Sequence, residues 1–448
     1  MIEGNHGAAY RLAGALIVCL AVVACESTVP PTVAPTSTAA ATPTGSADPS
    51  AVPPTTAVPA TESPSPSPSP SPSPSPTPSP APSPSPSPTP TAPTGWSAPQ
   101  LVDSQTVSYL AVTVDAGGFT HLVASDFHGI YYFSDASGLW ARTDLTRAAE
   151  GTADIEPAIT ISPEGTIAVA FTRWSKWDFC VDVCEPQGEN ELEGIYFMTN
   201  AAGEWTDPRQ VPGFGQGAAI GFLQGELSVV SEQPDGLYWQ RREGVEWASR
   251  LIGGPNAGSA RLVVGSDDTA FVVFRTPDGV DYAKRGGGFE SGPIPGTQGA
   301  ERPQLALDEQ GRPNVVYGVF DEADQESSVF HALLDADEWT SPDDLGVARA
   351  DSLAIDAAGN LHLAYLRVVE EGSGDELRLW EEAWYAGIVA GGPQAVRLSR
   401  GVVDEFGPGS AAVLTLKLDG SPQLLFSTLG DGASVAQGIY SAVGPVLP

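Results

Sequence analysis

Alternating apolar residues, a Gly-containing turn and a second apolar run recur together through the C-terminal three quarters of the chain. The clearest copy is DSLAIDAAGNLHLAYL, Asp351 to Leu366, in which Leu353 and Ile355 alternate with other residues and Asp356 to Gly359 has turn chemistry. This pattern predicts a β-hairpin. Six weaker copies begin at Tyr109, Pro157, Ala218, Ala260, Pro303 and Ala411.

A second hairpin follows the first in each repeat. Gly-hydrophobic-Tyr introduces a third strand, for example at Gly129 and Gly438, and a fourth strand begins with tryptophan at Trp140, Trp205, Trp247 and Trp339. Repeats of about 40 to 50 residues built from short strands are typical of β-propellers, with one four-stranded blade per repeat. The sequence therefore predicts an all-β, seven-bladed β-propeller. Because the copies are eroded, six or eight blades are the alternatives.

The two ends of the repeat array complement each other. The seventh repeat ends at Pro448 without a Trp-led strand, and an unpaired Trp96 to Leu101 with the matching Trp-x-x-Pro pattern precedes the first repeat. We predict that the 96–102 strand pairs with Gly438 to Val443 and closes the ring, which removes the open edge of a linear array.

Composition divides the chain into three parts: residues 1–25, 26–95 and 96–448. Residues 1–25 hold a short apolar run from Leu12 to Ala24, which reads as an export signal. Residues 26–95 are rich in Pro, Ser and Thr and have almost no apolar side chains, so we expect a disordered, extended stalk. Residues 96–448 form the predicted propeller.

Val22-Val23-Ala24-Cys25 resembles the lipobox of bacterial lipoproteins. The resemblance implies that Cys25 carries a lipid and that the protein is exported and anchored at the extracytoplasmic face of the cell membrane. The alternative is an ordinary signal peptide with an incidental cysteine, or a wrongly chosen start codon.

The strongly negative charge argues against nucleic acid as a partner. The formal net charge is −34, and the only lysines are Lys176, Lys284 and Lys417, so we expect no nucleic-acid binding. We also expect the protein to be a monomer.

Two cysteines of the predicted propeller lie close together in the sequence. Cys180 and Cys184 lie in an extended loop, and in an exported protein this spacing favours a local disulfide. The alternative is a calcium site formed by neighbouring carboxylates, and no other metal or cofactor is predicted. These carboxylates are Asp178, Asp182, Glu185, Glu189, Glu191 and Glu193.

The turn SDASGLW, Ser134 to Trp140, resembles the Asp-box of the sialidase, or BNR-repeat, superfamily, and eroded copies lie at Asn200 and Leu334. The resemblance implies a propeller. Sialidase-like catalysis would also need an arginine cluster for a substrate carboxylate, a Tyr-Glu pair and an Asp acid/base. Where sialidases carry Phe/Tyr-Arg-Ile-Pro, this chain has Trp96-Ser97-Ala98-Pro99.

Second-strand ends supply the catalytic candidates, because those ends lie on the face where propellers usually bind ligands. They are Asp126, Arg173, Glu232, Arg275 and Arg367. The competing interpretation is that they are ordinary exposed charges. His121 and His362 occupy equivalent repeat positions, where we expect packing or a blade-to-blade hydrogen bond.

Enlarged loops in the second and sixth repeats supply the ligand-binding candidates Trp174, Trp177, Arg173 and Arg367. With no complete catalytic constellation in the sequence, the leading hypothesis is a surface-anchored, non-catalytic binding or scaffolding module for a glycan, peptide or envelope partner. The alternative hypothesis is a divergent sialidase-like glycoside hydrolase or lyase. Convergence of Arg173, Arg275 and Arg367 around a pocket would favour the alternative.

Overall fold

The computed structural model describes residues 95–447 except 127, 150, 176–190, 202, 287, 322–325, 373–377, 390–391, 403–410 and 431–435. These residues contain strands and turns but no helix, and so no helix among them is suited to crossing a membrane.

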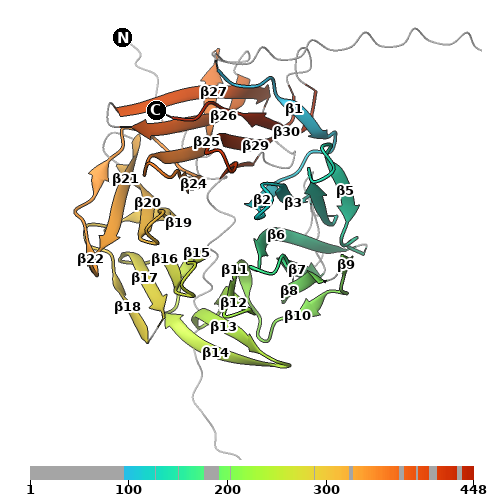
Figure 1. Cartoon of the computed structure of the whole chain (residues 1–448), viewed down its shortest axis with the longest axis vertical. Coiled ribbons are helices and arrows are strands. Elements are labelled where there is room, and N and C mark those ends of the chain that lie inside the picture. Colours follow the sequence, from blue (N-terminus) through green and yellow to red (C-terminus); the bar gives the residue numbers. More distant parts are fainter. Residues whose placement is uncertain are drawn as a thin grey trace, which may run out of the picture. The chain divides into compact units, whose positions relative to one another are not determined.

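Seven antiparallel sheets are arranged around a central axis as a seven-bladed β-propeller (Figure 1). The blade number predicted from the repeats is confirmed. From inner to outer strand, blade one consists of β2 (Tyr109–Val114), β3 (Thr120–Ser125), β4 (Ile130–Ser134) and β5 (Ala141–Asp144). Blade two consists of β6 (Thr152–Ile161), β7 (Ile167–Ser175) and β8 (Glu191–Ala201), with β9 (Glu204–Trp205) and β10 (Arg209–Gln210) both paired to β8. Blade three consists of β11 (Gln216–Leu223), β12 (Glu226–Gln233), β13 (Gly236–Glu243) and β14 (Glu246–Gly253).

The remaining four blades follow the same order. Blade four consists of β15 (Gly258–Val264), β16 (Ala270–Thr276), β17 (Gly279–Arg285) and β18 (Phe289–Pro293), and blade five of β19 (Ala300–Leu307), β20 (Pro313–Asp321) and β21 (Glu326–Asp335), with β22 (Glu338–Trp339) and β23 (Asp343–Asp344) both paired to β21. Blade six consists of β24 (Ser352–Ile355), β25 (Leu361–Glu371), β26 (Arg378–Val389) and β27 (Gly392–Val402). Blade seven consists of β28 (Ala412–Leu416), β29 (Pro422–Thr428), β30 (Gly438–Val443) and β1 (Gln100–Asp103).

The predicted ring closure is confirmed. Strand β1 pairs antiparallel with β30, with Gln100 opposite Ser441 and Leu101 opposite Tyr440. The backbone N of Ser97 donates to the carbonyl oxygen of Val443 at 2.8 Å. The N-terminal strand therefore completes the seventh blade.

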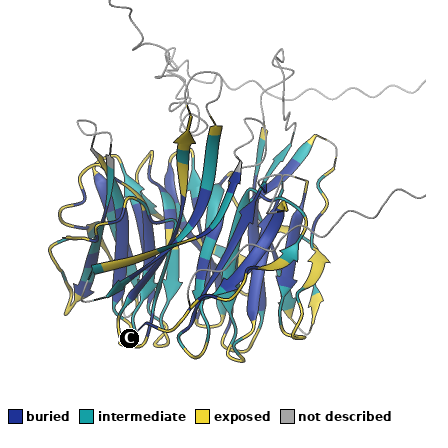
Figure 2. Cartoon of the chain, turned by 90° about the horizontal axis from the view of Figure 1, so that it is seen from above, coloured by how far each residue is buried: buried dark blue, intermediate teal, exposed yellow. Residues whose placement is uncertain are grey.

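Hydrophobic contacts seal all seven junctions between neighbouring blades, and the sheets are most buried in their central parts (Figure 2). The Trp-led outer strands explain part of this packing. Trp205 packs edge-on against Tyr132 of the preceding blade, with ring centroids 5.1 Å apart, and Trp247 and Trp339 make equivalent contacts. Such edge-to-face pairs stabilise beyond their burial, and these half-buried tryptophans pack against the hydrophobic clusters between blades.

His121 and His362 have matching environments. Each Nδ1 lies within hydrogen-bond distance of a tyrosine hydroxyl in its own blade: 2.5 Å from Tyr132 for His121 and 2.8 Å from Tyr385 for His362. The packing role expected from the sequence is confirmed, but the hydrogen bond stays within the blade.

Candidate functional site

The inner strands of all seven blades surround a central cavity of about 670 Å³. Because every blade runs from inner to outer strand in the same order, the inner strands all begin on one face, which we call the polar face. Near these strand beginnings, seven larger polar side chains line the cavity: Tyr109, Glu156, Glu232, Arg261, Arg302, Gln304 and Arg349, joined by Asp351.

A β-bulge recurs at the same place in the inner strands of blades two to five. The pairing register shifts between Ile155 and Ala158, and at the equivalent places in β11, β15 and β19. The bulged residues Glu156, Ser259 and Arg302 have φ of 54°, 52° and 52°, a region that side chains other than glycine rarely adopt. Bulges re-aim side chains, and such strain concentrates at functional sites. Here, Glu156 and Arg302 are aimed into the cavity.

Blades two and three supply the acidic side of the cavity. The hydroxyl of Thr172 donates to Oε2 of Glu156 at 3.1 Å, and the backbone N of Ser259 donates to Oε1 of Glu232 at 2.6 Å. Burial raises the pKa of Glu156, and the neighbouring Glu232 raises it further. Burial also raises the pKa of Glu232, against the hydrogen bond from Ser259 and the charge of Arg275. Both carboxyl groups therefore favour the protonated form more than an exposed glutamate does.

Two glycines leave room for the Glu232 carboxylate. A Cβ at Gly258 would lie 2.6 Å from Oε1 of Glu232, and one at Gly217 would lie 3.2 Å from the same oxygen. The Glu232 side chain thus lies against the inner strands of its own and the next blade, where no larger residue fits.

Blades four to six supply the basic side. Nε of Arg261 donates to Oε1 of Gln304 at 3.0 Å, and Nη1 donates to the carbonyl oxygen of Ala260 at 3.0 Å. Among the described residues no carboxylate lies within 4.0 Å of Arg261. Burial lowers the pKa of this arginine, although a guanidinium stays charged in proteins. The Arg261 side chain is therefore a cation that is exposed toward the cavity and has no carboxylate held against it in the described residues.

Arg302 and Arg349 share one aspartate. Nε of Arg349 donates to Oδ1 of Asp351 at 2.8 Å, and Nη1 of Arg302 lies 3.9 Å from the same oxygen. Burial lowers the pKa of Arg302, and the adjacent Arg349 lowers it further. Two guanidinium groups held near one carboxylate leave positive charge for an anionic ligand.

Tyr109 borders the acidic side from blade one. Burial, together with the charge of Glu156, raises its pKa to about 12. The hydroxyl therefore remains protonated at neutral pH.

Just beyond the polar residues, the cavity lining includes one aliphatic residue from each blade. Three of them, Ile220, Leu305 and Leu414, are buried in blade-junction clusters, and the other four are partly exposed. The register places all seven opposite equivalent residues of the second strands. This aliphatic ring consists of Val112, Ile159, Ile220, Leu262, Leu305, Leu353 and Leu414.

Of the five catalytic candidates named from the sequence, only Glu232 lines the cavity. Arg173 makes a two-point ion pair with the buried Asp154, at 2.6 and 2.8 Å, and stacks over Tyr196. Arg275 lies on β16 near enough to Glu232 to oppose its raised pKa, while Arg367 is exposed on β25 opposite Glu382. The cavity arginines are thus a different set from those predicted.

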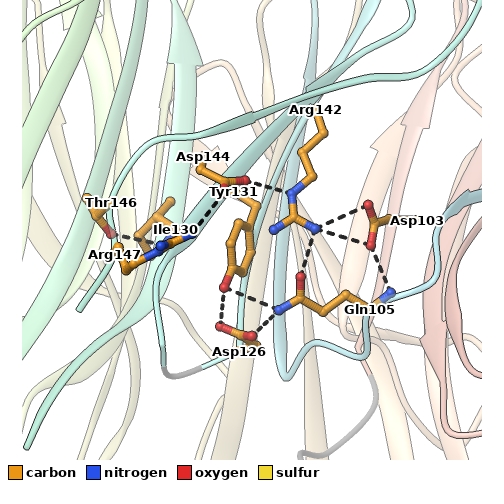
Figure 3. Close-up of polar contacts among 9 residues, drawn as sticks. All are labelled: Asp103, Gln105, Asp126, Ile130, Tyr131, Arg142, Asp144, Thr146 and Arg147. Atoms are coloured by element: carbon orange, nitrogen blue, oxygen red, sulfur yellow. Dashed lines mark hydrogen bonds and ion pairs between the residues drawn. The ribbon is translucent and has the colours of Figure 1, made fainter. Parts of the chain in front are cut away.

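Asp126 belongs to a polar network beside the ring closure (Figure 3). It accepts hydrogen bonds from the Tyr131 hydroxyl at 2.9 Å and from Gln105. Nη1 of Arg142 donates to Oε1 of Gln105 at 2.8 Å and lies 3.3 Å from Asp103 at the end of β1. These contacts tie the closing strand to blade one.

The sequence reasoning missed Glu156, Arg261, Arg302 and Arg349. Glu156 and Arg302 stand immediately before the hairpin repeats that begin at Pro157 and Pro303. A charged residue directly before an alternating apolar run is therefore the sequence feature that could have identified Glu156 and Arg302.

Several predicted residues lie outside the described part of the chain: Cys25, Trp177, Cys180, Cys184 and most of the proposed calcium ligands. Trp174 is described on β7, half-buried and opposite Leu192. Within the described residues, no cluster of His, Cys, Asp and Glu has the makings of a metal site.

No protein-family profile matches the sequence, and no curated protein matches it either. Solved structures do match. A Dyadobacter fermentans protein of unknown function is 12% identical, with a TM-score of 0.46, over 79% of this chain and 100% of that one. A PL25 ulvan lyase bound to a saccharide is 13% identical, with a TM-score of 0.48, over 77% and 95%. A WD40 β-propeller domain is 10% identical, with a TM-score of 0.41, over 78% and 97%. Similarity at this level concerns the propeller fold and says nothing about activity.

Proposed function

We propose that the protein cleaves glycosidic bonds in a carboxylate-bearing glycan, by hydrolysis or elimination, and that the central cavity is its active site. One observation carries the proposal: two carboxyl groups with raised pKa and three arginines line a single cavity. This proposal keeps the alternative hypothesis from the sequence, a glycoside hydrolase or lyase, but assigns it to cavity residues of which only Glu232 was predicted.

The basic side would hold the substrate carboxylate. Guanidinium groups match carboxylates in planar, two-point hydrogen bonds. Arg261 has no carboxylate partner among the described residues, and its Nε and Nη1 are positioned by Gln304 and Ala260. Inside a concave site such an interaction is screened less by solvent than on an open surface.

The acidic side would move the proton. In elimination the carbon next to the substrate carboxylate gives up its proton as the bond to the departing oxygen breaks, and in hydrolysis water attacks the anomeric carbon and gives up a proton. Glu156, as a carboxylate, would accept this proton. In both reactions the departing sugar oxygen takes up a proton, which a carboxyl group with raised pKa can supply. Glu232 is the proposed acid, because one oxygen is fixed by Ser259 and the side chain faces the cavity. Burial and the charge of Glu232 raise the pKa of the neighbouring Glu156.

Incubation with polygalacturonate, alginate, hyaluronan and sialylated oligosaccharides tests the proposal. New reducing ends would report any cleavage, and the ultraviolet absorbance of an unsaturated uronate would identify elimination. We expect at least one substrate to be cleaved, with the rate reduced at least about a hundredfold in Glu232→Gln and Arg261→Ala. Arg367→Ala is the matched control, because Arg367 is an exposed arginine that does not line the cavity. Cleavage that survives in Glu232→Gln would exclude this acid.

A non-catalytic binding module remains the second candidate. The observation favouring it is that Glu156 and Glu232 also support the backbone at blade junctions: Thr172 bonds both Glu156 and the N of Gly217 in the next blade, and Glu232 bonds Ser259 of the next blade. Binding of a carboxylated glycan without new reducing ends would favour this function.

A further inference from the structure

We infer that the protein recognises the ends of carboxylated glycan chains and not their interiors. This inference rests on the proposed function, because it concerns the same cavity. Its basis is the direction from which a ligand can reach the polar residues.

Lateral access to the cavity is closed. Hydrophobic clusters fill each of the seven blade junctions, and the β1–β30 pairing leaves no open blade. A glycan therefore approaches along the axis of the ring. A polymer that lies across a groove can present any internal bond, whereas a polymer that enters an axial cavity presents its end.

The aliphatic ring opposes threading of the chain through the channel. Ile159 and Leu305 follow the bulged Glu156 and Arg302 by three residues, one of which is the extra residue of the bulge. At about 3.3 Å per strand step, the ring therefore lies roughly 7 Å deeper than the bulges. Hydroxyl groups that pass this ring would meet its four partly exposed aliphatic side chains and lose hydrogen bonds to water without replacement. A chain entering from the polar face is thus halted near this ring.

The polar residues are placed to hold a terminal sugar at that depth. Arg261 and Gln304 project from inner-strand positions where blades one to three have alanine, and each pairs with the equivalent second-strand residue. They therefore extend into the cavity just above the aliphatic ring. A terminal carboxylate would meet Arg261, while hydroxyl groups of the same sugar would face Glu232, held beside β15, and Glu156 of blade two.

The experiment uses one polymer at two chain lengths. Polygalacturonate and alginate are each tested intact and after partial acid hydrolysis, at equal mass, so that only the number of chain ends differs. For the full-length Glu232→Gln protein, we expect bound protein at saturation to rise in proportion to the number of ends. For the wild type, we expect short products of one size class from the first time points.

The outcomes separate this inference from the proposed function. Binding that follows polymer mass, or products that begin as a ladder of all sizes, would overturn chain-end recognition even if cleavage occurs. Binding that follows chain ends without cleavage by the wild type would uphold the inference and contradict the catalytic proposal. Absence of both binding and cleavage would contradict both.

Discussion

The Arg261 guanidinium depends on Gln304 for its orientation. Gln304 is largely buried and accepts the only hydrogen bond that the described residues record from Nε of Arg261. In Gln304→Ala we expect KM for a carboxylated substrate to rise about tenfold with little change in kcat, since one hydrogen bond to a charged group contributes about 1.5–3 kcal/mol. Steady-state kinetics on the cleaved glycan would show this. A fall in kcat with unchanged KM would place Gln304 in a different role.

Glu156 should make stability depend on pH. Burial and Glu232 raise the pKa of Glu156 in the folded protein. Between the ordinary pKa of about 4.5 and this raised pKa, the folded state binds more protons than the unfolded state. The contribution of Glu156 to folding stability is therefore complete below about pH 4.5 and is lost as the pH rises through the raised pKa. We expect the Tm of the wild type to fall relative to Glu156→Gln as the pH increases from about 4.5 to 7.5. The comparison with the glutamine variant removes the contributions of titrating groups that do not interact with Glu156. A Tm difference that stays constant with pH would contradict the raised pKa.

At the scale of single elements, the inner-strand bulges hold strained residues. Ser259 has φ of 52°, and its backbone N bonds Glu232. Ser259→Gly keeps this N–H and removes the Cβ that disfavours the left-handed region. We expect it to raise the free energy of unfolding by about 1 kcal/mol. Ser259→Ala, which keeps the Cβ, is the control. Equal stability of the two variants in urea titrations would argue against strain at this bulge.

The strands were predictable from the sequence but the bulges were not. Alternation such as that of Leu353 and Ile355 identifies a strand because one face packs against the neighbouring blade. A bulge interrupts this alternation by one residue, so Glu156 and Arg302 read as the polar ends of loops. Glu232 was predicted because it ends a regular strand. Arg261 was missed because its cavity-facing role depends on the residues around it in other blades.

Ring closure depends on contacts at the end of β1. Arg142 bonds Asp103 and Gln105 and lies 4.2 Å from the centre of the Tyr131 ring. We expect Arg142→Ala to lower the free energy of unfolding by about 1 kcal/mol, as partly exposed ion pairs and cation–π contacts contribute. Arg147→Ala, whose side chain is 88% exposed, serves as control and should change stability by less than about 0.5 kcal/mol. Equal effects in urea titrations would show that the network does not support closure.

At the scale of the whole molecule, attachment to the membrane remains a prediction from Cys25. We expect the wild-type protein from its native host to partition into the detergent phase, and the Cys25→Ala variant to be released or left unprocessed. Mass spectrometry of the mature N-terminus would detect the lipid. Unmodified wild-type protein in the medium would contradict the anchor.

The central claim for the molecule is that the seven inner strands form a site for a sugar carboxylate. The claim places the ligand on the axis, away from Arg173 on β7 and Arg367 on β25, which the sequence favoured. It also explains why arginines from three blades face one cavity in a chain with net charge −34.

The most direct measurement is a crystal structure of the Glu232→Gln variant soaked with a short oligogalacturonate. The account predicts a terminal sugar in the central cavity, with its carboxylate within hydrogen-bond distance of Arg261 and with Arg302 or Arg349 beside it. A saccharide bound on the outer loops, with the cavity occupied by water alone, would contradict it.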